Sequence, residues 1–361
     1  MKVAIIGTVG VPANYGGYET LAENLISRKC NTSIEYQVYC SSKAYKIKLK
    51  KYKGATLKYY PLNANGWQAL VYDSISLVHA YLTADFILSL GTSSCTILPL
   101  IKHFSKKIVI VNFDGLDHKR EKWSSLSKII ISATRKLAAR YADVCISDNE
   151  EIKKYVKKVY KRDSVLIEYG GDNAKPVCDE EMLAKYGLAV REYVFKVARV
   201  EPENNIAMIL ESFTRIPSQK LVIVGNWNKS TYGKILRRKY ILYPNIIMLD
   251  PIYDSKILDI LRSNCKIYIH GHSAGGTNPS LVEAMNLRLP IFAYGVSYNK
   301  ATTEKKALYF YNTDSLIKLL NSINEAELNT VADEMYKIAK RRYQWDVICE
   351  RYEALFKYQN A

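Results

Sequence analysis

Long apolar runs are missing from this sequence. No stretch approaches the ~20 consecutive apolar residues that a helix needs to span a bilayer, so we expect no transmembrane segment. The first residues form no basic segment followed by an apolar core, and we therefore expect no signal peptide. These absences together predict a globular chain in the cytoplasm.

Cysteine pairs are also missing. The seven cysteines are scattered along the chain, and none forms a C-x-x-C motif. Such an odd and unpatterned set favours reduced thiols over a disulfide framework or a zinc site. The chain also lacks D-x-D, a carboxylate pair suited to holding a divalent ion against a diphosphate. We accordingly expect no metal and no other cofactor.

The sequence also lacks the glycine motif of dinucleotide-binding domains. The loop after the first apolar run reads "GTVGVPANYGGYET" (7–20), and its glycines do not have the G-x-G-x-x-G spacing. No acidic residue ends the next strand, so a nicotinamide or flavin site is disfavoured. Gly16 and Gly17 still permit close approach of a ligand at a helix start, where N–H groups face an anion. A plain turn is the alternative.

Acidic residues are too few to balance the basic ones, and the net charge is +17. Residues 1–170 hold 26 Lys and Arg against 14 Asp and Glu, while the remainder holds 26 against 21. The basic residues are densest at 44–60 and 153–162. Such a surface attracts polyanions. No zinc finger, RNA-recognition or recognition-helix pattern accompanies it, so an anionic membrane surface is favoured over nucleic acid, with a merely solubilising surface as the alternative.

The chain of 361 residues is long enough for two domains of about 150 residues each. Apolar runs alternate with helical patterns and predict two doubly wound parallel sheets, an α/β fold. Expected strands are 2–7, 34–41, 57–62, 85–91, 107–115, 143–148 and 164–171, then 193–200, 220–226, 245–251, 266–272 and 290–295. A linker is expected at 169–181. We predict domains at 1–168 and 169–340, and an amphipathic C-terminal helix within 341–361.

Ligands of such sheets bind beyond the carboxyl ends of the strands. One loop there, "HGHSAGGTNPSLVEAM" (270–285), is rich in glycine and leads into a helix near Pro279. Its amides can hold a diphosphate, and Glu283 can accept from two ribose hydroxyls. A capped helix with an exposed Glu is the alternative. A second loop, "ARVEPENN" (198–205), places Arg199 where its guanidinium suits a diphosphate. A surface ion pair with Glu201 or Glu203 is the alternative.

At these motifs the chain resembles the GT-B glycosyltransferases of family 4, which are retaining nucleotide-sugar transferases, over nearly its whole length. Segments 7–20 and 111–123 resemble the subgroup of bacterial rhamnosyltransferases of capsule and cell-wall polysaccharide synthesis. Two departures stand out. Gly275 occupies the position of the first Glu of the family's E-x7-E motif, and Asn204 that of its diphosphate-binding Lys. The first change fits a 6-deoxy sugar such as rhamnose, and the second removes a positive charge.

The resemblance implies two GT-B domains, of which the first binds the acceptor and the second the nucleotide sugar. The C-terminal helix is expected to cross back to the first domain. Implied donor-binding residues are Gly16, Gly17, Arg199, Asn204, Tyr253, His272, Gly275, Gly276, Thr277, Asn278, Pro279, Ser280 and Glu283. Implied acceptor-binding residues are Tyr18, Glu19, Asp114, Asp117, Lys119 and Arg120. Asp114, Arg199 and His118 are the candidate catalytic residues. For Asp114 a capping role, and for His118 plain solvation, are the alternatives.

The expected function is transfer of a sugar, L-rhamnose from dTDP-rhamnose in the main hypothesis, onto a polyprenyl-diphosphate-linked saccharide. The enzyme would be a metal-independent hexosyltransferase, peripheral on the cytoplasmic face of the inner membrane. A UDP-hexose or other UDP-sugar donor is the alternative within the same fold. A sugar-nucleotide epimerase and a non-catalytic polyanion-binding protein are more remote alternatives.

Overall fold

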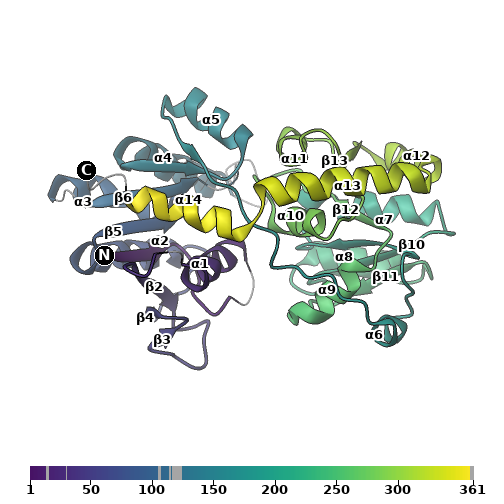
Figure 1. Cartoon of the computed structure of the whole chain (residues 1–361), viewed down its shortest axis with the longest axis horizontal. Coiled ribbons are helices and arrows are strands. Elements are labelled where there is room, and N and C mark those ends of the chain that lie inside the picture. The colour runs from purple at the N-terminus through teal and green to yellow at the C-terminus, as the bar shows by residue number, and fades with distance from the viewer. Residues whose placement is uncertain (14–15, 30, 105–106, 114, 116–123, 358–361) are drawn as a thin grey trace. The chain divides into compact units, whose positions relative to one another are not determined.

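The computed structural model describes the chain except for residues 14–15, 30, 105–106, 114, 116–123 and 358–361. It divides into two compact units (Figure 1). The first unit comprises Met1–Tyr169 together with Trp345–Ala361, and the second comprises Gly170–Gln344. Each unit is built on one β-sheet, so the predicted α/β class with two parallel sheets is confirmed.

The sheet of the first unit has the strand order β3-β4-β2-β1-β5-β6-β7-β8. Among its described pairs, only β3 and β4 run antiparallel. The strands are β1 (Lys2–Ile6), β2 (Glu35–Ser41), β3 (Lys51–Tyr52), β4 (Ala55–Tyr60), β5 (Phe86–Leu90), β6 (Ile108–Phe113), β7 (Val144–Ser147) and β8 (Val165–Leu166). The order reverses between β1 and β5. The loops after these two strands therefore form the topological switch point, where open α/β sheets bind ligands.

Helices cover both faces of this sheet because successive side chains of a strand point to opposite faces. Val3 and Ile5 belong to one apolar cluster, and Ala4 and Ile6 to the other. The helices are α1 (Gly17–Ser27), α2 (Gln68–Thr83), α3 (Leu98–Phe104), α4 (Ser125–Tyr141), α5 (Glu150–Tyr160) and α14 (Trp345–Lys357), with a 3₁₀ turn η1 (Ser93–Thr96). Helices α1 and α14 contribute to the first cluster, and α2 to α5 contribute to the second.

The C-terminal helix α14 packs on the first unit, as predicted. Its apolar stripe is fully buried in the cluster that contains β1; these residues are Trp345, Ile348, Tyr352 and Phe356. The Asn112 amide donates to the hydroxyl of Tyr352 at 2.9 Å. An ion pair of 3.0 Å joins Arg351 to the buried Glu168. The amphipathic pattern therefore indicated both the helix and the side that it buries.

The sheet of the second unit is parallel throughout its described pairs, in the order β11-β10-β9-β12-β13-β14. Its strands are β9 (Tyr193–Val197), β10 (Lys220–Val224), β11 (Ile246–Leu249), β12 (Ile267–His270), β13 (Ile291–Tyr294) and β14 (Leu308–Phe310). Its helices are α6 (Glu180–Lys185), α7 (Ile206–Thr214), α8 (Thr231–Tyr240), α9 (Ser255–Ser263), α10 (Pro279–Asn286), α11 (Ser297–Thr302), α12 (Thr313–Ser322) and α13 (Glu325–Arg342), with a 3₁₀ turn η3 (Pro202–Asn204). The switch point lies between β9 and β12, whose loops are the two motifs at 198–205 and 270–285.

The sequence pattern misjudged three strands. The strand expected at 164–171 contracts to the two residues of β8, because the chain leaves the sheet edge after Leu166. The two-residue strand β3, which pairs antiparallel with β4, and the edge strand β14 were not expected, since each is too short to show periodicity. None of the six described cysteines forms a disulfide with another of them, and five of the six are buried. Within the described residues, no helix has both the length and the apolar character for crossing a bilayer.

Candidate functional site

The two predicted donor loops of the second unit are bonded to each other. The backbone N–H of Ser273, in the loop after β12, donates to the carbonyl of Glu203 at 2.8 Å. The Asn205 side chain donates back to the carbonyl of Gly271 at 2.9 Å. The sequence keeps these loops 66 residues apart, but the switch point brings them together, as it does at ligand sites of doubly wound sheets.

Gly271 lies where the two loops approach most closely. A Cβ at this position would lie 2.5 Å from the Asn204 carbonyl oxygen and 3.1 Å from Nζ of Lys196. Any larger residue would push the loops apart. Asn204 is 2 % exposed, and its side chain donates to the carbonyl of Arg199 at 2.7 Å. Asn204 therefore braces its own loop at the position where the resemblance places a lysine.

Arg199 follows β9, and its side chain is 40 % exposed. Its Nε lies 3.9 Å from a carboxylate oxygen of Glu201, at the outer limit of an ion pair. A pair of this length between partly exposed side chains contributes little to stability. The guanidinium is thus positioned at the switch point without a strong partner among the described residues.

The glycine-rich loop leads into α10 at Pro279, where the sequence predicted a helix start. Asn278 caps the helix, since its side-chain oxygen accepts from the N–H of Ser280 at 3.2 Å and from its hydroxyl at 2.8 Å. Gly275 has a φ of 149°, a conformation that favours glycine, and a Cβ there would meet open space. The amide groups at such a helix start favour an anion.

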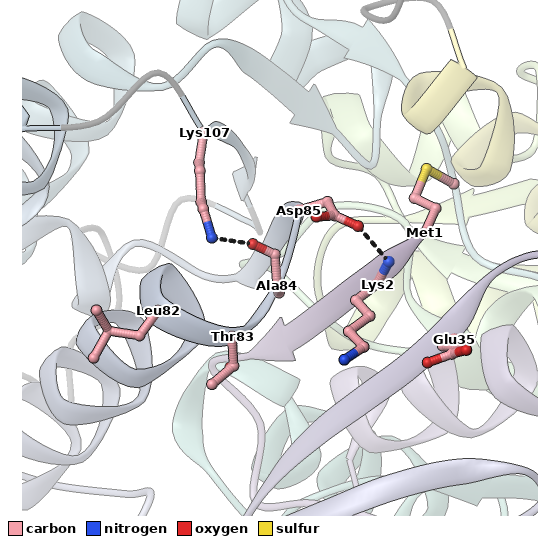
Figure 2. Close-up of a pocket in the computed structure, with 8 residues that line it drawn as sticks. All are labelled: Met1, Lys2, Glu35, Leu82, Thr83, Ala84, Asp85 and Lys107. Atoms are coloured by element: carbon pink, nitrogen blue, oxygen red, sulfur yellow. Dashed lines mark hydrogen bonds between the residues drawn. The ribbon is translucent and has the colours of Figure 1, made fainter.

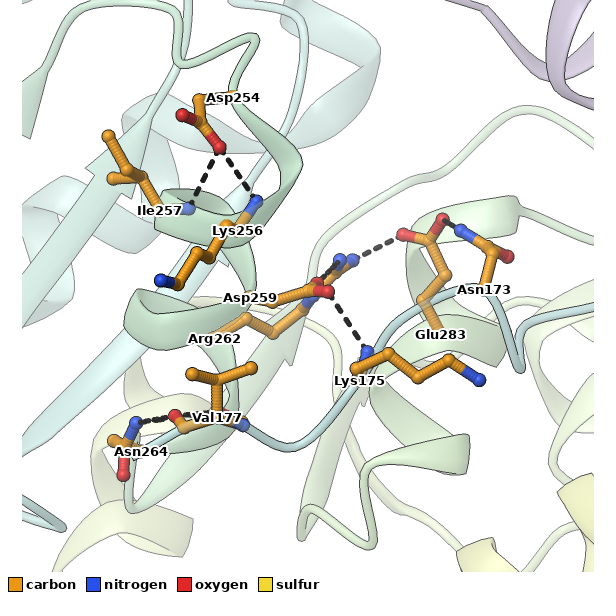
Figure 3. A network of polar contacts seen from close by, with 11 residues as sticks. Asn173, Lys175, Val177, Asp254, Lys256, Ile257, Asp259, Arg262, Asn264 and Glu283 are labelled. Carbon is orange, nitrogen blue, oxygen red and sulfur yellow. Dashed lines mark hydrogen bonds and ion pairs between the residues drawn. The ribbon is translucent and has the colours of Figure 1, made fainter. Parts of the chain in front are cut away.

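Glu283 lies one turn into α10 and is held by two partners (Figure 3). It forms an ion pair with Arg262 of α9, and its other oxygen accepts from the Asn173 amide at 2.8 Å. Arg262 is buried and also pairs with Asp259 at 2.9 Å. Asp259 in turn accepts from the backbone N–H of Lys175 at 2.9 Å. Glu283 is therefore not the simple exposed Glu of the alternative: it connects α9, α10 and the predicted linker.

Two titratable groups lie buried below these loops. Burial lowers the pKa of Lys196, on β9, to about 7, and its Nζ has no hydrogen-bond acceptor among the described residues. Burial, and then the charge of Lys196, keep the pKa of His270 well below its usual range. The His270 ring stacks on that of His272, with centroids 4.3 Å apart. Sequence reasoning named His272 but missed Lys196, whose only signal is a lysine within the apolar run of β9.

Tyr253 lies apart from this centre. It follows β11, an edge strand two positions from β9, and is 67 % exposed. The next residue, Asp254, caps α9 by accepting from the N–H of Lys256 at 2.9 Å. Its exposure agrees with the surface alternative, and stacking on a nucleobase stays a prediction.

The first unit has a second cluster at its own switch point. An oxygen of the buried Glu19 accepts from the hydroxyl of Thr8 at 2.9 Å and from the N–H of Val9 at 2.8 Å. Glu19 thus holds the loop after β1, a structural role that the acceptor-binding prediction did not include. Gly16 has a φ of 131° just before α1, which begins at Gly17. The ring of Tyr18 lies against Gly91, in the loop after β5.

Asp73 of α2 is a residue of this cluster that sequence reasoning missed. It accepts from the hydroxyl of Ser93, in the turn that follows the β5 loop. Burial raises its pKa to about 7, against the hydrogen bond from Ser93, which lowers it. The neighbouring Tyr72 donates to the carbonyl of Thr8 at 3.1 Å and so ties α2 to the β1 loop. The remaining first-unit candidates, Asp114, Asp117, His118, Lys119 and Arg120, lie outside the described residues.

The first unit has a hollow of about 340 Å³ at the opposite end of its sheet from its own switch point (Figure 2). It opens at the amino ends of β1 and β5, where Lys2 donates its N–H to Asp85 at 2.8 Å and Lys107 donates to the Ala84 carbonyl at 2.6 Å. Lys2, Lys107, Glu35 and Asp85 are among its lining residues, and none of the predicted site residues lines it. Within the described residues, no cluster of three or more metal-ligating side chains occurs.

Comparisons with known proteins identify the class. Residues 1–172 match the family described as Domain of unknown function (DUF1972), and residues 179–342 match Glycosyl transferases group 1. No curated protein matches significantly. The chain is therefore a glycosyltransferase, with a group 1 glycosyltransferase domain at 179–342 and a DUF1972 domain at 1–172.

Solved structures share the GT-B fold. A sucrose-phosphate synthase from Thermosynechococcus elongatus aligns with a TM-score of 0.83 at 15 % identity, over 99 % of this chain and 98 % of that one. The Anabaena protein Alr3699/HepE, in complex with UDP-glucose, aligns with a TM-score of 0.75 at 15 % identity, over 98 % and 99 %. A putative UDP-N-acetylglucosamine 2-epimerase from Listeria monocytogenes aligns with a TM-score of 0.64 at 16 % identity, over 99 % and 96 %.

Proposed function

We propose that this enzyme transfers a hexose from a UDP-sugar, with retention, to a lipid-linked saccharide during synthesis of a surface polysaccharide. The second unit would take the donor and the first unit the acceptor. One observation carries the donor assignment: the loops after β9 and β12 are joined at the switch point, beside the N-terminus of α10 and Glu283. A diphosphate and a ribose would fit these groups in that order.

A UDP-sugar is favoured over the dTDP-rhamnose of the main sequence hypothesis. The Anabaena protein of the same fold was crystallised with UDP and with UDP-glucose. The role assigned to Glu283 agrees, because a carboxylate that accepts from two ribose hydroxyls requires a ribonucleotide, and dTDP has only one such hydroxyl. Rhamnose is the second candidate for the transferred sugar. It is favoured by Gly275, which stands where the first Glu of the E-x7-E motif would be.

The proposed reaction depends mainly on stabilising the negative charge of the leaving diphosphate. The bond between the anomeric carbon and the diphosphate oxygen breaks, and a bond to an acceptor hydroxyl oxygen forms on the same face of the sugar. UDP departs with the electron pair of the broken bond, and the hydroxyl proton passes to an oxygen of the departing diphosphate. Arg199 and the amides of residues 276–280 are proposed to stabilise the negative charge that develops on the leaving diphosphate. Asp114 is proposed to orient the acceptor hydroxyl.

A binding screen separates the remaining alternatives. Thermal unfolding would be followed with UDP-glucose, UDP-N-acetylglucosamine, dTDP-rhamnose and a single-stranded oligonucleotide. The proposal predicts stabilisation by a UDP-sugar and none by the oligonucleotide. Stabilisation by the oligonucleotide alone would indicate a polyanion-binding protein. Conversion of the UDP-sugar to its epimer without release of UDP would indicate an epimerase.

A further inference from the structure

Helix α2 of the first unit presents an apolar face to the outside. Its exposed positions are all apolar: Val71, Ile75, Val78 and Leu82, spaced four, three and four residues apart. This spacing places them along one side of the helix. Just before the helix, Trp67 is 78 % exposed. A surface helix normally turns its charged residues outward, so α2 departs from the usual pattern.

The inward side of α2 carries polar residues that would usually lie on the outer side of a surface helix. The only charged residue of the helix, Asp73, is buried, and so are Tyr72 and Ser76. The helix thus buries Asp73 and Ser76 together with Leu77 and Ala80, while its exposed positions carry only aliphatic side chains. Burial of these four aliphatic side chains against a partner would remove their apolar surface from water and so stabilise the complex.

The apolar surface continues onto α3. The hydroxyl of Tyr81, near the end of α2, donates to the carbonyl of Phe104 at 3.1 Å, so the two helices lie side by side at this end. Phe104 is 68 % exposed, and Leu100, one turn earlier, is also exposed. We call this surface the α2–α3 face; it consists of Trp67, Val71, Ile75, Val78, Leu82, Leu100 and Phe104.

The charge around the α2–α3 face decides between possible occupants. Lys136 and Arg140 of α4 are exposed, and Lys128 of the same helix is partly exposed. The other two basic residues of α3 and α4 add no free surface charge, because Arg135 is buried and Lys102 pairs with Asp143 at 2.8 Å. The one acidic residue of α2, Asp73, is buried. A second copy of a chain with net charge +17 would bring like charge against like. An anionic lipid surface would bring the opposite charge.

We propose that the α2–α3 face inserts into the surface of an anionic membrane, with the basic residues of α4 against the lipid phosphates. A helix with an apolar side and nearby basic residues lies in the plane of the interface in this way. Trp67, at the edge of the face, suits the headgroup level. This surface deepens the proposed function and rests on it for the presence of a lipid-linked acceptor.

The basic 44–60 segment does not supply the apolar contact with the membrane. Two of its tyrosines are engaged within the protein. Tyr45 donates to the carbonyl of Pro12 at 3.0 Å, and Tyr52 donates to Glu23 at 2.7 Å. Both pack against the core of the first unit. The lysines of this segment can still attract the membrane, but the apolar contact is assigned to α2 and α3.

Vesicle sedimentation tests the α2–α3 face. The variant Val71→Gln/Val78→Gln/Leu82→Gln removes its aliphatic groups, and Ile235→Gln/Ile241→Gln/Leu242→Gln is the matched control on exposed positions of the second unit. We expect about a tenfold or larger loss of binding to phosphatidylglycerol vesicles in the first variant and none in the control. Thermal unfolding of both variants should match the parent. Trp67 fluorescence should shift to shorter wavelength on binding, a change lost in Trp67→Phe.

Two results would overturn the proposal. Unchanged vesicle binding of the α2 variant would mean that the lysine clusters alone attach the protein. A parent that is dimeric in solution and becomes monomeric in the α2 variant would assign the face to a second copy. Sugar transfer to a short soluble acceptor is measured separately. If the parent protein transfers sugar but does not bind the vesicles, the membrane face is wrong and the glycosyltransferase function stands. If the parent binds the vesicles but transfers no sugar, the membrane face stands and the proposed function is wrong.

Discussion

The carboxylate of Glu283 forms an ion pair with the buried guanidinium of Arg262. This pair links the proposed ribose-binding residue to the core of the second unit, because Arg262 is 3 % exposed and also pairs with Asp259. A substitution at Glu283 must therefore change stability as well as ligand binding, which the sequence alone did not indicate.

For Glu283→Gln we expect a loss of about 2–3 kcal/mol in the free energy of unfolding, since removing one partner leaves a buried charge poorly compensated. Denaturant unfolding measures this loss, and Glu283→Gln/Arg262→Met should recover part of it. We also expect the variant to lose the preference for UDP over its 2′-deoxy analogue, measured by calorimetry. An undiminished preference would remove Glu283 from the ribose site.

Arg199→Lys keeps the positive charge at the switch point but loses the two-pronged geometry of the guanidinium. We expect kcat to fall about tenfold or more while KM changes less, because the charge on the leaving diphosphate is greatest in the transition state. Steady-state kinetics with saturating acceptor measure both constants. Arg215→Lys, on a surface ion pair of the same unit, is the control. Equal kcat in Arg199→Lys and the parent would refute this role.

Lys196 gives the second unit a pH-dependent stability. Its folded pKa, about 7, lies below the ordinary value of 10.5, so the unfolded chain binds the proton more tightly. Stability is therefore unaffected above about pH 10.5 and is lost as the pH falls toward 7, below which the loss levels off. We expect the free energy of unfolding of Lys196→Met to exceed that of the parent by a growing amount as the pH falls from about 10.5 to 7. A difference that is constant between pH 7 and 10 would show that Lys196 is charged in the fold.

Activity should persist in excess EDTA. The proposed stabilisation of the leaving diphosphate comes from Arg199 and the amides at the start of α10, and neither needs a divalent ion. Initial rates with and without chelator, after dialysis, measure this directly. Loss of activity that returns only with Mg²⁺ or Mn²⁺ would assign the charge stabilisation to a metal.

The sequence predicted what periodicity and local motifs determine. The alternation of apolar runs with helical patterns predicted the two sheets, and Pro279 indicated the start of α10. Periodicity could not reveal contacts between distant residues, such as Asn173 with Glu283, which are 110 positions apart. It also could not orient α2, because the apolar residues at 71, 75, 78 and 82 face outward while Leu77 and Ala80 face inward. Both sides of that helix are apolar in sequence, and only packing distinguishes them.

The most direct test of the central claim is analysis of the reaction products. The enzyme would be incubated with anionic vesicles that carry a polyprenyl-diphosphate-linked saccharide, and with UDP-glucose, UDP-N-acetylglucosamine or dTDP-rhamnose in parallel. The account predicts that the lipid-linked saccharide gains the mass of one sugar from a UDP donor, with equimolar release of UDP. A gain of one deoxyhexose from dTDP-rhamnose alone would contradict the proposed donor, and release of no nucleoside diphosphate from any donor would contradict sugar transfer itself.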